Sequence, residues 1–231
     1  MTILALEFSS PQRSVAVACA GRVLGEVIET GARARPDQKA GALTRQSGAT
    51  EAFSMIETVL REAKLEREQI EILAVGLGPG SYTGVRAALS MAQGWQLARG
   101  AKLLGVSSGD CLAAQAQAER IFGRVNAVVD AQRNEFYLAA YEISEQGWNA
   151  IGPLRIVTME EIQSRAEARE ILIGPEVTRW VPGGRTIFPR AATLARLAVE
   201  RNGFVAGEKL EPIYLREANF VKAPVRKSTA L

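Results

Sequence analysis

The sequence predicts an α/β protein of two lobes, and two observations support this fold class. Short apolar runs alternate with long segments in which apolar residues recur at helical spacing, as in packed layers of strands and helices. A strand-and-hairpin pattern at the start of the chain recurs near residue 124, in pattern although not in residue identity. We expect one lobe over residues 1–105 and a smaller lobe over residues 106–231, whose last helix packs back on the first lobe.

The first half of the chain predicts a meander followed by alternating helices and strands. The apolar runs TILALEF, SVAVACA and RVLGEVIE are joined by short Gly, Ser and Pro connectors, which is typical of antiparallel strands. The basic stretch GARARPDQKAG, residues 31–41, predicts a loop. The elements expected next are a helix from about Leu43 to Lys64, the strand EILAVGLG, a helix from Ser81 to Arg99, the strand KLLGVSS and a helix from Gly109 to Arg120.

The second half repeats the plan and ends in a basic tail. Residues 124–144 predict a hairpin with its turn at residues 131–134, and EILIGPEV predicts another strand. PRAATLARLAVERNG predicts a helix closed by Gly203. From LEPIYL onward the periodicity is lost, so we expect a tail that is disordered or ordered by a partner. Its basic residues are Lys222, Arg226 and Lys227.

The composition excludes several classes of enzyme. The chain contains no histidine, which removes the commonest general base and metal ligand, and with them Ser-His-Asp, Cys-His and HExxH chemistry. Two cysteines, Cys19 and Cys111, make no disulfide framework and fit a reducing cytoplasm. We expect no signal peptide and no membrane span. A net charge of +3 permits contact with nucleic acid without arguing for it. We expect only weak affinity for nucleic acid, from the tail and from Arg33, Arg35 and Lys39.

The segment GLGPGSYTGVR, residues 76–86, joins a strand to a helix through a glycine-rich loop. It has no lysine for a Walker loop, and its last glycine comes one residue too late for the dinucleotide fingerprint. Glycines there let the backbone approach an anion or another backbone closely, and a hydroxyl can cap the following helix. A tight capped turn and a degenerate phosphate loop both remain open. The residues concerned are Gly78, Gly80, Ser81 and Thr83.

The helix after this loop carries small residues at every fourth position. Such a stripe lets another helix approach to roughly 8 Å between axes. The preceding helix is also apolar on more than one face, so we expect the pair to dock a partner, although packing of the stripe on its own sheet alone is the alternative. The residues of this expected interface are Phe53, Ile56, Gly84, Ala87, Ala88, Met91, Ala92 and Trp95.

Four segments carry a resemblance to a known family. GLGPGSYTGVRAALSMAQG, with MTILALEFSS, DAQRNEFY and EPIYLRE in the same order, resembles the TsaB family of bacterial tRNA threonylcarbamoyladenosine biosynthesis proteins. The resemblance covers nearly the whole chain. It implies two ribonuclease-H-like lobes of the actin/Hsp70-type ATPase superfold. It also implies partners: a homologous catalytic subunit (TsaD-like), an ATPase subunit (TsaE-like), and tRNA through the complex. Homodimer and heterodimer both stay open for the isolated chain.

Departures from the family's catalytic relatives imply a non-catalytic subunit. Those relatives carry H-x-x-x-H after a strand, where this chain has Ser108 and Leu112. ATP-using relatives carry an Asp after the apolar run of the first strand, where this chain has Glu7. Glu7 and Ser9 either contact phosphate or end a strand, and Asp130 and Glu135 are either ligands or charges of a hairpin turn. We expect ATP and Mg²⁺ only at the partner interface or in the catalytic subunit. The alternatives are an ATP-dependent small-molecule kinase or ATPase of the same superfold, and a metallopeptidase, which the absence of histidine disfavours.

The missing histidines give a first prediction. We expect the purified protein to contain no stoichiometric transition metal, because Leu112 cannot ligate a metal and a neutral serine is a poor ligand. Elemental analysis after dialysis is the measurement. About one zinc or iron per chain would contradict it.

Overall fold

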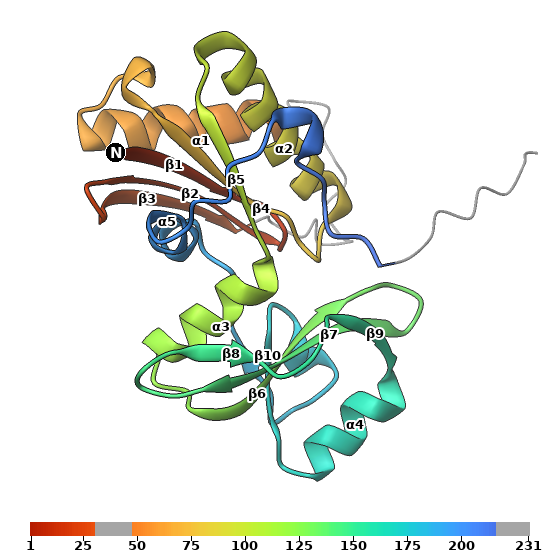
Figure 1. The fold of residues 1–231 in the computed structure, drawn as a ribbon. Coiled ribbons are helices and arrows are strands. Elements are labelled where there is room, and N and C mark those ends of the chain that lie inside the picture. Colours follow the sequence, from red (N-terminus) through yellow and green to blue (C-terminus); the bar gives the residue numbers. More distant parts are fainter. Residues whose placement is uncertain (31–47, 216–231) are drawn as a thin grey trace, which may run out of the picture.

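The computed structural model describes residues 1–30 and 48–215, which form two lobes, each built on one sheet (Figure 1). The first sheet has the order β3-β2-β1-β4-β5. β1, β2 and β3 form an antiparallel meander, and β4 and β5 run parallel to β1. The predicted strands are confirmed. Their bounds are β1 (Thr2–Glu7), β2 (Gln12–Cys19), β3 (Arg22–Thr30), β4 (Ile72–Gly76) and β5 (Lys102–Val106).

The second sheet repeats the topology of the first. Counted from β8, its order is β8-β7-β6-β10-β11, with β6, β7 and β8 antiparallel and β10 and β11 parallel to β6. A further strand, β9, pairs with β7. The predicted two-lobe α/β fold is therefore confirmed. The strands are β6 (Gly123–Asp130), β7 (Glu135–Ile143), β8 (Trp148–Ala150), β9 (Arg155–Thr158), β10 (Ile171–Gly174) and β11 (Arg185–Thr186).

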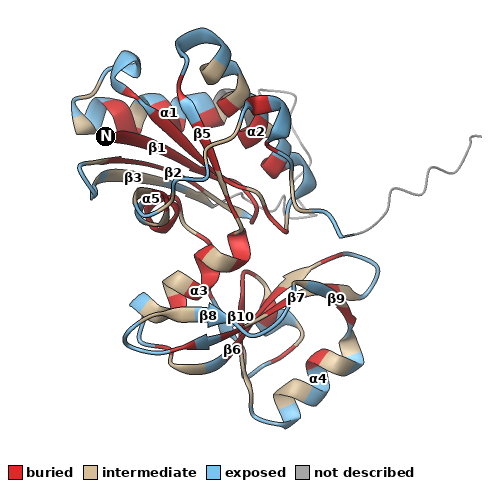
Figure 2. Ribbon diagram, viewed as in Figure 1, coloured by how far each residue is buried: buried red, intermediate tan, exposed pale blue. Residues whose placement is uncertain are grey.

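Helices cover both faces of the first sheet. α1 (Gly48–Ala63) and α2 (Tyr82–Arg99) lie on one face, and α5 (Ala191–Val199) lies on the other. β1 is consequently buried along its whole length, as Figure 2 shows, which explains its unbroken apolar sequence TILALE. No helix among the described residues is long and apolar enough to cross a membrane.

The two lobes exchange the helix that follows their last strand. α3 (Ser108–Ala118) follows β5 of the first sheet but packs on β6 and β7 of the second. α5 follows β11 of the second sheet but packs on β1 and β2 of the first. The division of the chain at residue 105 into two domains stays a prediction.

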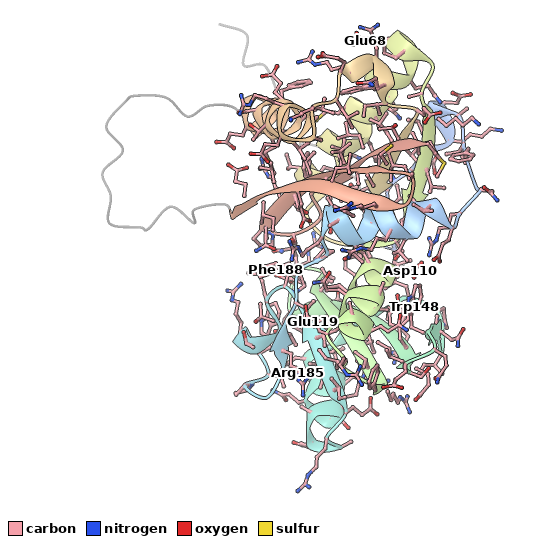
Figure 3. The ribbon with its side chains drawn as sticks, turned by 90° about the vertical axis from the view of Figure 1, so that its left-hand side faces the viewer. Glu68, Asp110, Glu119, Trp148, Arg185 and Phe188 are labelled. Atoms are coloured by element: carbon pink, nitrogen blue, oxygen red, sulfur yellow. The ribbon has the colours of Figure 1, made fainter. Side chains whose placement is uncertain are left out.

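The exchanged helices also contact each other. Thr193 on α5 donates a hydrogen bond of 2.7 Å to Gln115 on α3. Asp110, which lies where the lobes meet in Figure 3, pairs with Arg201 at 2.9 Å and accepts a hydrogen bond from Tyr141 of β7. The contact between the lobes therefore includes the two exchanged helices and the polar interactions of their side chains.

The amino end of α5 is held by side chains of the first sheet. The amide of Ala191 donates to Oγ of Ser14 at 2.8 Å, and the amide of Ala192 donates to Oε1 of Glu26 at 3.0 Å. The other oxygen of Glu26 pairs with Arg190. Because the first amides of a helix have no partner within it, a carboxylate at this position stabilises α5 and its place on the sheet.

Several predicted boundaries differ from the structure. α5 ends at Val199, so the prediction that Gly203 closes this helix was wrong. The amides of Glu200 and Arg201 both donate a hydrogen bond to the carbonyl of Ala198. Further along the chain, the amide of Val205 donates to the carbonyl of Leu103 on β5. No element was predicted at β8, β9, β11 or α4 (Met159–Glu167). The start expected for the first helix, Leu43, lies outside the described residues.

The start of the predicted tail packs on the first lobe of its own chain. Leu210 is buried in the core of the first lobe, and the amide of Ile213 donates to the carbonyl of Leu77 at 2.9 Å. The expectation was therefore wrong for residues 210–215, which bind to the first lobe through an apolar side chain and the backbone. The basic residues Lys222, Arg226 and Lys227, and those of the loop, Arg33, Arg35 and Lys39, lie outside the described residues.

The contacts of Glu26 give a second prediction. Glu26→Ala removes the acceptor of a helix-terminal amide and the partner of Arg190, so we expect a loss of about 1–2 kcal/mol of unfolding free energy. Urea unfolding measures it. Glu62→Ala, at an exposed position of α1, is the control and should stay within about 0.5 kcal/mol of wild type. Equal effects of the two substitutions would contradict a role for Glu26 in holding α5.

Candidate functional site

The glycine-rich loop packs directly on the end of β1. A Cβ atom added at Gly80 would lie 2.0 Å from the carbonyl oxygen of Ser9, and one at Gly84 would lie 2.0 Å from that of Phe8. The amide of Ser81 donates to the same Ser9 carbonyl at 2.7 Å. The glycines at positions 80 and 84 therefore allow one backbone to approach another.

Ser81 begins the helix that follows this loop. Its Oγ accepts a hydrogen bond of 3.2 Å from the amide of Gly84, so Ser81 is the N-cap of α2. Thr83, the other candidate cap, lies exposed in the first turn. Gly78 adopts a φ of +85°, which only glycine adopts without strain, and this turns the chain away from β4.

Glu7 lies at the end of β1 and joins three parts of the fold. Its side chain is fully buried. Oε1 accepts from the amide of Ser9 at 2.8 Å, and Oε2 accepts from the hydroxyl of Ser108 at 3.0 Å. Ser108 in turn exchanges hydrogen bonds with the backbone of Gly78, its Oγ accepting at 3.2 Å and its amide donating at 2.8 Å. One carboxylate thus connects β1, the glycine-rich loop and the start of α3.

Space for the Glu7 carboxylate is provided by a glycine of β4. A Cβ atom at Gly76 would lie 2.0 Å from Oε2 of Glu7. Burial raises the pKa of Glu7, and the hydrogen bonds from Ser9 and Ser108 oppose this shift without overcoming it. No ion pair with Glu7 occurs among residues 1–30 and 48–215.

These residues do not fit a Mg²⁺–ATP site. Both oxygens of Glu7 already accept hydrogen bonds from the protein, and the loop of residues 76–86 has no lysine. Within the part of the chain that the structure describes, no three His, Cys, Asp or Glu residues are grouped so that they could hold a metal ion. The structure brings Glu7, Ser9, Gly78, Gly80 and Ser81 together as a closed, self-bonded junction.

The other candidate ligands lie in structural positions. Leu112, at the second position where catalytic relatives carry histidine, is buried in the core of the second lobe. Asp130 accepts hydrogen bonds from the amide of Gln132 at 2.7 Å and from its side chain at 3.1 Å. This carboxylate therefore shapes the hairpin turn between β6 and β7, which confirms the predicted hairpin, and Glu135 is the first residue of β7.

The small-residue stripe of α2 faces the chain's own sheet. Gly84, Ala88 and Ala92 are buried in the core of the first lobe, as is Ile56 of α1. These four residues therefore lie beneath the surface in the folded chain, and Ala88→Trp would overpack the core rather than test a partner contact. Ala87, Met91 and Trp95 are half-buried, and Phe53 is 51% exposed. A partner interface at these four residues stays a prediction.

Sequence reasoning missed an aromatic cluster at the start of α2. The ring of Tyr82 stacks on that of Tyr214, with centroids 5.3 Å apart, and the guanidinium of Arg86 lies 3.9 Å from the centroid of Tyr82. The spacing of Tyr82 and Arg86, four residues apart on a helix, could have indicated their contact. Tyr214 lies far away in the sequence and gave no local signal.

Comparisons with known proteins agree with this fold. The protein-family model "TsaD: tRNA N6-adenosine threonylcarbamoyltransferase" matches residues 44–215, which is most of the chain. The chain belongs to the TsaD family. Within this family it is similar to proteins named TsaB, "tRNA threonylcarbamoyladenosine biosynthesis protein". The Escherichia coli TsaB is 28% identical over 70% of this chain and 78% of its own length. The Haemophilus influenzae TsaB is 26% identical over 98% and 99%.

Solved structures support the same assignment. The structure "YeaZ from Pseudomonas aeruginosa" has a TM-score of 0.72 and 27% sequence identity, covering 93% of this chain and 99% of that one. Another structure, of "an uncharacterized protein with similarity to peptidase YEAZ" from the same organism, has a TM-score of 0.74 at the same identity and coverage. The resemblance to TsaB expected from the sequence is thereby confirmed.

The burial of Glu7 gives a third prediction for this TsaD-family chain. Because the folded pKa of Glu7 is raised, its contribution to stability is complete below its ordinary value of 4.5 and is lost as the pH rises through the folded pKa. Glu7→Gln removes this titration. We therefore expect wild type to lose unfolding free energy relative to Glu7→Gln as the pH rises from about 4.5 to 8, by about 1.4 kcal/mol for each unit of pKa shift.

Urea unfolding of both proteins at several pH values is the measurement. The exposed substitution Glu62→Gln serves as the control. A difference between wild type and Glu7→Gln that stays constant across this range would mean that Glu7 is not held in a desolvated site.

Proposed function

We propose that this chain is a non-catalytic subunit of the machinery that forms N6-threonylcarbamoyladenosine next to the tRNA anticodon. In this role it binds and activates a homologous catalytic subunit. Membership of the TsaD family and similarity to proteins named TsaB support the pathway. The observation that carries the non-catalytic role is the closed junction around Glu7, where the chain's own groups occupy both carboxylate oxygens.

The chemistry of the reaction belongs, in this proposal, to the partner. The chain has no histidine, and Ser108 is engaged with Glu7 and Gly78 rather than directed at a substrate. ATP and Mg²⁺ bind in the catalytic subunit or at its interface with this chain, and an ATPase subunit of the TsaE kind completes the assembly. The complex contacts tRNA and works in the cytoplasm. The alternative of a small-molecule kinase would require Mg²⁺-dependent ATP binding by this chain alone.

The surface proposed for the catalytic subunit is the outer face of the α1–α2 pair. Phe53 on α1 is a large apolar side chain that is half exposed, and Ala87 and Met91 on α2 are partly exposed beside the core. This pair lies on the face of the first sheet opposite to α5 (Figure 1). A homologous partner would supply a similar pair, so that four helices form the interface. Self-association of the isolated chain would use the same surface.

The α1–α2 surface gives a fourth prediction. Phe53→Asp places a charge on an exposed apolar position, so the chain stays folded while a contact that buries this side chain is lost. We expect affinity for the catalytic subunit from the same organism to fall at least about tenfold, which is about 1.4 kcal/mol. Size-exclusion chromatography and a titration of the mixed pair measure it, with circular dichroism of the variant alone.

The matched control is Leu24→Asp, since Leu24 is also a large apolar residue, 43% exposed, but lies on β3. It should co-elute with the partner like wild type. Undiminished binding of Phe53→Asp would place the interface elsewhere. If the catalytic subunit forms threonylcarbamoyladenosine equally well without this chain, the proposed function itself fails.

A further inference from the structure

A pocket of about 270 Å³ lies where the two exchanged helices meet the edge of the first sheet. Its walls come from the edge strand β3, from α3 and from the amino end of α5. Figure 3 shows α5 lying above α3 at the place where the lobes meet. The volume is close to the lower end of the range for small-molecule sites, about 300–1,000 Å³. The pocket therefore has room for a molecule of metabolite size.

Two arginines supply the positive charge of this pocket. Arg190 pairs with Glu26 through one terminal nitrogen, while its Nε is buried and has no hydrogen-bond partner among the described residues. The side chain of Arg190 is 38% exposed, so part of it is in contact with solvent. Arg196 on α5 is exposed and has no ion pair within residues 1–30 and 48–215. The charges of the lining therefore sum to 2 − 1 = +1.

The acceptors of the pocket are already engaged, whereas its donors are not. One oxygen of Glu26 accepts from the amide of Ala192 at 3.0 Å, and the other pairs with Arg190. Oε1 of Gln115 accepts from Thr193 at 2.7 Å, and the Gln115 amide nitrogen donates to Glu119, which is outside the lining. A guanidinium has five N–H donors and no acceptor. Spare donors beside a net positive charge select an anion as ligand.

Apolar side chains from all three elements complete the lining. Val23 and Leu24 come from β3, Ala118 comes from α3, and Ala192 comes from α5. Leu24 is 43% exposed, so apolar surface is available to a ligand. Burial of a hydrocarbon group against such a wall removes apolar area from water, which favours binding. The pocket therefore suits an anion with an apolar part better than a bare inorganic ion.

This pocket is separate from the sites described above. Its lining contains none of the residues that make the junction around Glu7, and none from α1 or α2. It lies on the side of the first sheet that carries α5, and the α1–α2 pair covers the opposite face. A ligand in the pocket would therefore leave the surface proposed for the catalytic subunit free.

We propose that this pocket binds a small organic anion, a carboxylate or a phosphate ester that carries a short apolar group. Arg190 and Arg196 hold the oxygens of the anion, and Val23 and Leu24 contact the apolar group. The proposal goes beyond the proposed function and does not rest on it, because the single chain contains the whole pocket. The ligand contacts β3 of the first lobe and α3, which packs on the second, so it ties the lobes together. Since it binds only the folded chain, it raises the Tm.

The test is a calorimetric titration of the full chain with three probes, namely phenyl phosphate, benzoate and inorganic phosphate. Sodium chloride keeps the ionic strength constant, so that general screening is the same in every titration. We expect saturable binding of phenyl phosphate or benzoate, and the tighter of the two identifies the head group. Phenyl phosphate should bind at least about fivefold more tightly than inorganic phosphate, because its ring is buried against the apolar wall.

Two variants locate the binding in this pocket. Arg196→Gln removes a cation that has no ion pair in the described residues, and we expect at least about fivefold weaker binding of the organic anion. Ala118→Phe fills the pocket from an exposed position of α3 without a change of charge, and should weaken binding as much. Circular dichroism and the Tm of each variant without ligand check that it is folded. Arg61→Gln, at an exposed position of α1, is the matched control and should bind like wild type.

Three results would overturn the proposal. One is the absence of saturable binding for both phenyl phosphate and benzoate. Another is binding that Arg196→Gln and Ala118→Phe both leave at the wild-type level. The third is a loss of affinity in Arg61→Gln as large as that in Arg196→Gln, which would show an effect of net charge alone. Failure of the proposed function would appear elsewhere, as threonylcarbamoyladenosine formation that does not need this chain.

Discussion

The hydrogen bonds of one buried carboxylate determine how the first lobe meets the second. Glu7 accepts from Ser9 of its own strand end and from Ser108 at the start of α3, and α3 is the helix that enters the second lobe. Ser108 also bonds to Gly78, so the loop before α2 is held by the same group. A carboxylate removed from water costs free energy unless its oxygens are satisfied. The end of β1 and the start of α3 have to meet for the oxygens of Glu7 to be satisfied, and Ser108 binds the loop at Gly78 at the same point.

The contacts around Glu7 explain why this loop is rich in glycine. In a phosphate-binding loop, glycines expose backbone amides to an anion. Here the amides of Ser9 and Gly78 bond to Glu7 and Ser108, and the glycines at positions 80 and 84 admit the carbonyls of Ser9 and Phe8. The amide of Ser9 and the hydroxyl of Ser108 therefore donate to a carboxylate of the chain itself.

The exchange of α3 and α5 makes the two lobes into one assembly. Each sheet is covered by a helix that the other lobe supplies, and Glu26 and Ser14 hold the amino end of α5 on the first sheet. The face of the first sheet that carries α1 and α2 is left outside this exchange. The surface that we propose for the catalytic subunit is the outer side of these two helices.

The sequence by itself determined the features that depend on neighbouring residues. Unbroken apolar runs predicted the buried strands, Ser81 before a helical pattern predicted the cap, and the turn at residues 131–134 predicted the hairpin, since periodicity, capping and turn chemistry act over a few residues. It also indicated the repeated lobe and the family. Tertiary structure alone decided which side of α2 is buried. Helical spacing identifies apolar residues such as Ala88, but it does not show whether the chain's own sheet or a partner covers them. It also decided where α5 ends, which sheet each exchanged helix covers, and that Tyr214 stacks on Tyr82 across 132 positions of the chain. These depend on contacts between distant segments, and no local pattern encodes the partner of a side chain.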